Sequence, residues 1–61
     1  MGGTKEVTRI FGSPRFVVDK YGNGEWLLTV EVEDFGALRK MTLRFNSQEE
    51  AENVTVNYRF L

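Results

Sequence analysis

The chain contains no cysteine and no histidine, and it has a single proline among 61 residues. Without cysteine there is no disulfide framework, no zinc–thiolate site and no thiol nucleophile. Without histidine the chain lacks the commonest metal ligand and the side chain best suited to proton transfer near neutral pH. These absences favour a protein that is not an enzyme and that uses no metal or other cofactor.

An excess of charge of one sign is also lacking, because eight basic and nine acidic side chains give a net charge of −1. No global field therefore attracts the chain to nucleic acid or to a membrane surface. The longest apolar runs, such as residues 16–18 and 26–28, are too short for a membrane span or a signal-peptide core. We expect a soluble cytoplasmic protein with no membrane partner and no small-molecule substrate.

The length predicts one small domain over residues 1–61, in which residues 1–4 are flexible. Ordering the chain costs about 1.5 kcal/mol per residue, against roughly 25 cal/mol for each Å² of apolar surface buried. These two quantities nearly cancel in a domain of this size. Self-association or a protein partner would add to its stability, and we expect one of the two.

Residues 25–45 have the pattern of a β-hairpin. Two alternating segments flank a turn at residues 34–37, formed either by a two-residue loop of Phe35 and Gly36 or by a four-residue loop. The charges select one register, because a slip by one residue would place lysine and arginine against the valines. The predicted inner pairs are Trp26 with Phe45, Leu28 with Leu43 and Val30 with Met41, and the outer pairs are Leu27 with Arg44, Thr29 with Thr42 and Glu31 with Lys40.

A second hairpin is predicted around residues 22–24. A three-residue loop with a left-handed Gly24 pairs Val18 with Leu28 and Phe16 with Val30. A two-residue turn is the alternative, but it places Asp19 on the face of Leu28, which the apolar pattern opposes. With the three-residue loop both hairpins agree on one inner face: Phe16, Val18, Trp26, Leu28, Val30, Val32, Met41, Leu43 and Phe45.

The remaining segments predict a first strand at residues 5–11, a short helical turn at residues 46–53 and a last strand at residues 54–60. Ser47 and Glu50 form a capping box for the helical turn, in which Ala51 is the only apolar residue. A turn at residues 12–14 separates the first two strands. We therefore predict a mainly all-β fold: a five-stranded antiparallel SH3-like small barrel, or a strongly bent meander, with one helical turn before the last strand.

The outer face of the predicted sheet carries basic side chains between apolar and threonine side chains. Paired carboxylates such as Glu31 and Glu33 have basic neighbours and no third ligand, so surface charge pairing explains them better than catalysis. Trp26 alternates in step with Leu28, Val30 and Val32 of the inner face, so it is predicted to lie in the core. The candidate partner-binding residues are Arg15, Val17, Leu27, Lys40, Arg44 and Arg59 on this face, with Tyr21 and Phe35 at turns.

Three functions follow from this pattern. The first is a non-enzymatic module that binds a protein, or a second copy of itself, through the exposed sheet face or an edge strand, as accessory proteins of phages and mobile elements do. The second is a small barrel that binds single-stranded nucleic acid through basic and aromatic side chains. The third is a designed or purely structural domain, because short turns and consistent patterning also mark idealised sequences.

Overall fold

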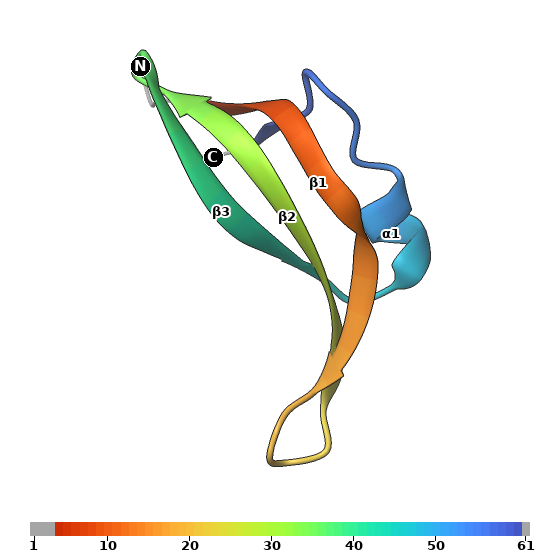
Figure 1. The fold of residues 1–61 in the computed structure, drawn as a ribbon. Coiled ribbons are helices and arrows are strands. Elements are labelled where there is room, and N and C mark those ends of the chain that lie inside the picture. Colours follow the sequence, from red (N-terminus) through yellow and green to blue (C-terminus); the bar gives the residue numbers. More distant parts are fainter. Residues whose placement is uncertain (1–3, 61) are drawn as a thin grey trace.

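The computed structural model describes residues 4–60, and of the predicted flexible segment only Thr4 lies within this range. Three long strands follow one another: β1 (Lys5–Val18), β2 (Gly24–Asp34) and β3 (Ala37–Phe45). A short helix, α1 (Gln48–Glu52), and a two-residue strand, β4 (Arg59–Phe60), follow them. The strands form one antiparallel sheet in the order β3-β2-β1-β4, so the last strand lies beside the first (Figure 1).

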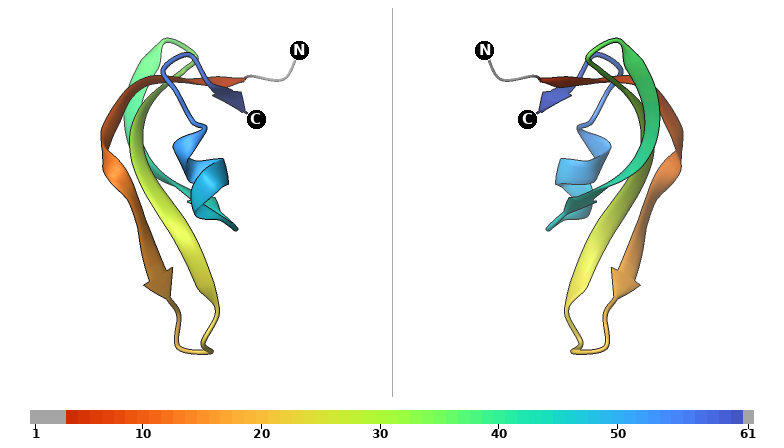
Figure 2. Two further views of the ribbon diagram at one scale, coloured as in Figure 1. Left: turned by 90° about the vertical axis from the view of Figure 1, so that its right-hand side faces the viewer. Right: turned by 90° about the vertical axis from the view of Figure 1, so that its left-hand side faces the viewer.

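The sheet curls into a half-barrel, and α1 lies on its concave side (Figure 2). Alternate residues of β2 point to this side and are buried, and Val7 of β1 joins them. Ala51 and Val54 cover this layer from the segment that contains α1. The core therefore occupies one face of one sheet: Val7, Leu28, Val30, Val32, Ala51 and Val54.

The register of β2 and β3 is confirmed for all six predicted pairs, from Trp26 opposite Phe45 to Glu31 opposite Lys40. The connection is the two-residue loop, since Asp34 pairs with Ala37. Phe35 and Gly36 both have positive φ, at 53° and 82°. This is the requirement of a type I′ turn, whose twist matches that of the flanking strands.

The prediction of five strands is wrong, because the first two predicted strands are the single strand β1. Phe11 lies opposite Thr29 and Arg15 lies opposite Leu27, so residues 12–14 form a bulge and the chain does not reverse there. Gly12 has a φ of 75°, a conformation that costs glycine little. β2 is long enough to pair with both halves of β1, which makes a turn unnecessary.

The predicted loop between β1 and β2 is also wrong. Val18 lies opposite Gly24, not opposite Leu28, and the loop spans residues 19–23. The Asp19 carboxylate accepts hydrogen bonds from the backbone N–H groups of Tyr21 (2.8 Å) and Asn23 (2.9 Å), which shapes this longer loop. The partner of Val18 moves from position 28 to position 24, an even displacement, so each side chain keeps its predicted face.

The longer pairing makes the end of the β1–β2 hairpin extend past α1 as an arm (Figure 1). Phe16 and Val18 face inward as predicted, but they are 55% and 54% exposed because the helix does not reach them. The Phe16 ring instead packs on Trp26, with 5.4 Å between ring centroids. Trp26 is half-buried, and so are Met41, Leu43 and Phe45 of β3.

The last strand is shorter than the predicted residues 54–60. Tyr58 donates its N–H to the Thr55 carbonyl oxygen, and Asn57 has a φ of 80°, so a turn precedes β4. One of the two hydrogen bonds of the predicted capping box is present, since the Glu50 N–H donates to Ser47 Oγ at 3.2 Å. Ala51 is the one buried residue of the helix. Within residues 4–60, no helix has the length and apolar character that crossing a membrane requires.

Candidate functional site

The outer, convex face of the sheet carries most of the residues that the sequence singled out. Three of them form one row across the three long strands, because Leu27 of β2 lies between Arg15 of β1 and Arg44 of β3. Val17 follows two residues after Arg15 on the same face and is 38% exposed. The row therefore presents one half-buried leucine between two exposed guanidinium groups.

A second row lies towards the middle of the sheet and is centred on Phe11. This ring is 36% exposed. Lys40 Nζ lies 5.2 Å from the ring centroid and Arg9 Cζ lies 6.0 Å from it. Each such cation–π contact is worth about 0.5–1 kcal/mol at an exposed site. Phe11 is thus an aromatic surface held between two cations.

Four carboxylates interrupt the positive charge of this face, and two of them, Glu6 and Glu33, lie opposite each other at the end of the sheet away from the arm. Glu31 lies between Arg9 and Lys40 in the ladder and accepts a hydrogen bond from Thr8 Oγ1 at 2.8 Å. Glu25 lies opposite Val17 near the arm. Between the row of Arg9 and the arm, four cations outnumber the carboxylates of Glu25 and Glu31, so this part of the face is basic. The four cations are Arg9, Arg15, Lys40 and Arg44. We call these four residues with Phe11 and Leu27 the basic face.

The other predicted site residues lie outside these two rows, although Arg59 is on the outer face as predicted. Arg59 of β4 lies opposite Glu6, and its Nε is 3.4 Å from Glu6 Oε1. Tyr21 is 77% exposed at the tip of the arm, and Phe35 is 85% exposed at the turn between β2 and β3. These two aromatic residues therefore lie beyond opposite ends of β2 and form no common surface.

Arg9 and Phe11 belong to this face although the sequence pattern does not predict it. Val7 and Ile10 both point inward although they are three residues apart, which strict alternation forbids. A bulge at Thr8 resolves the conflict, since Val7 pairs with Val32 and Arg9 with Glu31. No residue near position 8 signals this bulge, so the face of Phe11 was not predictable from alternation.

Acidic side chains gather on the opposite side of the sheet. Glu49, Glu50 and Glu52 are exposed on α1, which lies on the concave side (Figure 2). The two glutamates in its first turn also suit the positive end of the helix dipole. The four cations of the basic face and the glutamates of α1 therefore lie on opposite sides of the sheet, in a chain whose net charge is only −1.

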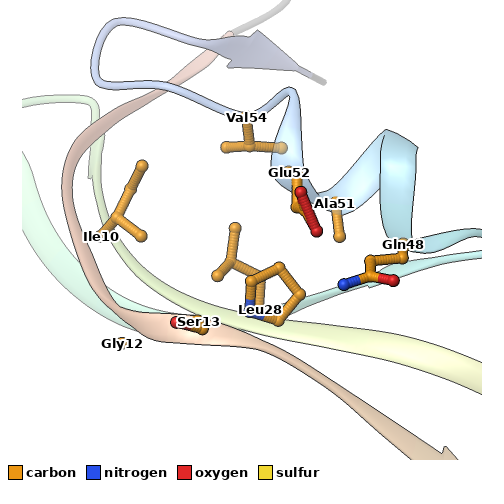
Figure 3. A pocket seen from close by; sticks show the side chains of 9 residues that line it. Ile10, Gly12, Ser13, Leu28, Gln48, Ala51, Glu52 and Val54 are labelled. Atoms are coloured by element: carbon orange, nitrogen blue, oxygen red, sulfur yellow. The ribbon is translucent and has the colours of Figure 1, made fainter.

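A groove of about 540 Å³ lies between the bulge of β1 and α1 (Figure 3). Its lining is mixed, and the apolar side chains come from Ile10, Pro14, Leu28, Ala51 and Val54. Ser13, Gln48 and Glu52 supply its side-chain polar groups, and none of the three makes a side-chain hydrogen bond to another described residue. A nucleophile paired with a base is therefore missing from this groove among residues 4–60.

The described carboxylates do not form a metal centre either, because residues 4–60 contain no group of three or more acidic side chains that could hold an ion. Comparison of the chain with family models, with curated proteins and with solved structures finds no match. The function is accordingly argued from the surface of this molecule alone.

Proposed function

We propose that the protein is a non-enzymatic interaction module that binds an acidic surface of a protein partner through its basic face. The observation that carries the proposal is the row in which Leu27 lies between Arg15 and Arg44, beside the cation-flanked Phe11. Interfaces need apolar groups that lose water on binding and charges that steer the partner. This surface offers both within neighbouring rows of one sheet.

Single-stranded nucleic acid is the second candidate ligand for the same face, and Phe11 favours it because a base stacks on an aromatic ring between cations. A protein partner is the better fit for two reasons. Among the outward positions of the described ladder, Phe11 is the only aromatic residue, so there is no series of rings for successive bases. Glu25 and Glu31 on this face would also repel phosphates.

The test compares two anionic probes, poly-L-glutamate and single-stranded oligothymidylate, in titrations at low and moderate salt. The variant Arg15→Glu/Arg44→Glu reverses both cations of the row. The matched control Lys20→Glu/Arg39→Glu makes the same change of net charge at positions outside the basic face. Tryptophan fluorescence and circular dichroism establish that each variant is folded.

We expect poly-L-glutamate to bind with an affinity that falls as salt rises, because exposed charges are screened. The Arg15→Glu/Arg44→Glu variant should lose about tenfold or more in affinity, which corresponds to roughly 1.4 kcal/mol. The control should lose clearly less. Equal losses in both variants, or no binding of poly-L-glutamate, would reject the basic face, and tighter binding of oligothymidylate would assign the face to nucleic acid.

A further inference from the structure

β3 is an edge strand with a long, unblocked edge. Its nine residues pair with β2 without a bulge, and no strand lies on its other side in the described sheet. Within residues 4–60, no backbone hydrogen bond joins β3 to a segment other than β2. Natural edge strands are usually shortened, bulged or covered, because their free N–H and C=O groups otherwise pair with another chain.

The turn between β2 and β3 determines which backbone groups are free. A two-residue type I′ turn makes Asp34 and Ala37 a hydrogen-bonded pair, and such pairs then alternate along the ladder. Residues 38, 40, 42 and 44 are therefore the ones whose N–H and C=O groups point away from β2. Their side chains are those of the outer face, so the free edge carries Lys40 and Arg44.

The charge of β3 distinguishes between possible occupants of this edge. The strand contains Arg39, Lys40 and Arg44 and no acidic residue. A second copy paired edge to edge would bring two sets of three cations together, and like charges destabilise neighbouring strands. A segment with glutamate or aspartate in its outward positions would instead oppose Lys40 and Arg44 with carboxylates.

The inner side of the same edge is apolar from Met41 to Phe45, whereas Arg39 occupies the inner position before them. A groove of about 160 Å³ lies where the half-barrel is open, between the end of β3 and the segment leading into β4. Leu43 and Phe45 line one side of it, and Tyr58 and Phe60 line the other, with their rings stacked at a centroid distance of 6.0 Å. Apolar side chains from an added strand would fill this opening.

We propose that the free edge of β3 accepts an extended segment of the partner as a fifth strand, and that this segment alternates acidic and apolar residues. Acidic residues lie opposite Lys40 and Arg44, and apolar residues lie opposite Leu43 and Phe45. The inference rests on the proposed function, since it takes the partner to be an acidic protein. It adds that the bound segment is extended and that its acidic and apolar residues alternate with a period of two.

The direct test uses a blocked synthetic peptide of sequence Val-Glu-Val-Thr-Val-Glu-Val. A peptide of the same composition with both glutamates moved to one end breaks the alternation, and a peptide with lysine for glutamate reverses the charge. NMR measures binding and amide hydrogen exchange. We expect only the alternating acidic peptide to bind, with slowed exchange at the amides of Lys40, Thr42 and Arg44 and no comparable change elsewhere in β3.

Thr42 provides the matched pair of variants. Its N–H points away from β2, so Thr42→Pro removes one donor from the free edge and leaves the ladder with β2 complete. Thr42→Val keeps this donor and changes only the side chain. Thr42→Pro should weaken binding of the alternating peptide by about tenfold or more, and Thr42→Val should not. Equal affinities for the two variants would overturn the inference.

The charge of the site has a separate test that does not depend on proline. Lys40→Glu should lose affinity for the acidic peptide and gain affinity for the lysine peptide. If Arg15→Glu/Arg44→Glu abolishes binding while Thr42→Pro does not, the edge inference is wrong and the basic face remains. If poly-L-glutamate fails to bind at all, the proposed function itself is wrong. A dimer that Thr42→Pro dissociates, with no peptide binding, would assign the edge to a second copy.

Discussion

Gly24 lies against the aromatic ring of Phe16, and a Cβ atom at Gly24 would stand 2.6 Å from Phe16 Cε1. Its φ is not positive, so the ring and not the backbone requires glycine here. The same ring packs on Trp26 in the arm. One missing side chain thus gives room for the aromatic pair.

We expect Gly24→Ala to displace the Phe16 ring from Trp26 and to lower the free energy of unfolding by about 0.5–1.5 kcal/mol, the typical worth of an aromatic pair. Urea unfolding followed by tryptophan fluorescence measures this change. In a Phe16→Ala background the Gly24→Ala substitution should cost almost nothing. The same cost in both backgrounds would show that the ring is not the cause.

The loop of the arm should respond to acid through Asp19. The hydrogen bond from the Asn23 backbone N–H, with a second from Tyr21, holds the pKa of Asp19 below its ordinary value of 3.8. Because this pKa is lowered by folding, the contribution of Asp19 to stability is fully present above the ordinary value and is lost as pH falls through the folded pKa. NMR titration of the carboxyl carbon should give a midpoint below 3.8, and the amides of Tyr21 and Asn23 should shift with the same midpoint. In Asp19→Asn this shared titration should vanish.

The bulge in β1 should depend on the conformation of Gly12 and not on space around it. Its φ is 75°, and an added Cβ would have no neighbour within 4 Å. Gly12→Ala should therefore destabilise the fold by roughly 1–2 kcal/mol through backbone strain alone. Gly12→Asn should cost less, because asparagine tolerates the left-handed region better. Urea unfolding of the two variants tests this order, which a purely steric effect would reverse.

A buried leucine and an exposed leucine test the assignment of the core. Leu28 is 2% exposed and Leu38 is 61% exposed. Leu28→Ala should cost about 2–5 kcal/mol, as much as the whole stability expected of a domain this small, about 3–5 kcal/mol. Leu38→Ala should change stability by less than about 0.5 kcal/mol. Circular dichroism at increasing temperature should show the first variant largely unfolded, and a folded Leu28→Ala protein would contradict the assigned core.

The register of β2 and β3 was predictable because three signals agree there. Every even-numbered residue from Trp26 to Val32 is apolar, the charges oppose any slip, and both loop lengths that the turn allows give the same register. The outer positions of Leu27, Lys40 and Arg44 followed from that register. These residues form the half of the basic face that the sequence defines.

β1 was not predictable in the same way, because two bulges break its alternation. Gly12 and Pro14 favour a turn locally. They form a bulge instead because β2 is long enough to pair with β1 on both sides of them. The loop between β1 and β2 depends on hydrogen bonds from the backbone N–H groups of Tyr21 and Asn23 to the Asp19 carboxylate. The glycines at 22 and 24 alone allow several turns. Phe11 and Arg9 belong to this part of the chain, so their place in the basic face became visible only in the structure.

Ala51 is the only buried side chain of α1, and it is buried against the concave side of the sheet. A helix of five residues cannot persist in water without such support. Conversely, the valines beneath it would meet solvent if the helix left. The curvature of the sheet and the helix therefore depend on each other. We expect both to form and to unfold in a single step, so that no stable form keeps α1 above a flattened sheet.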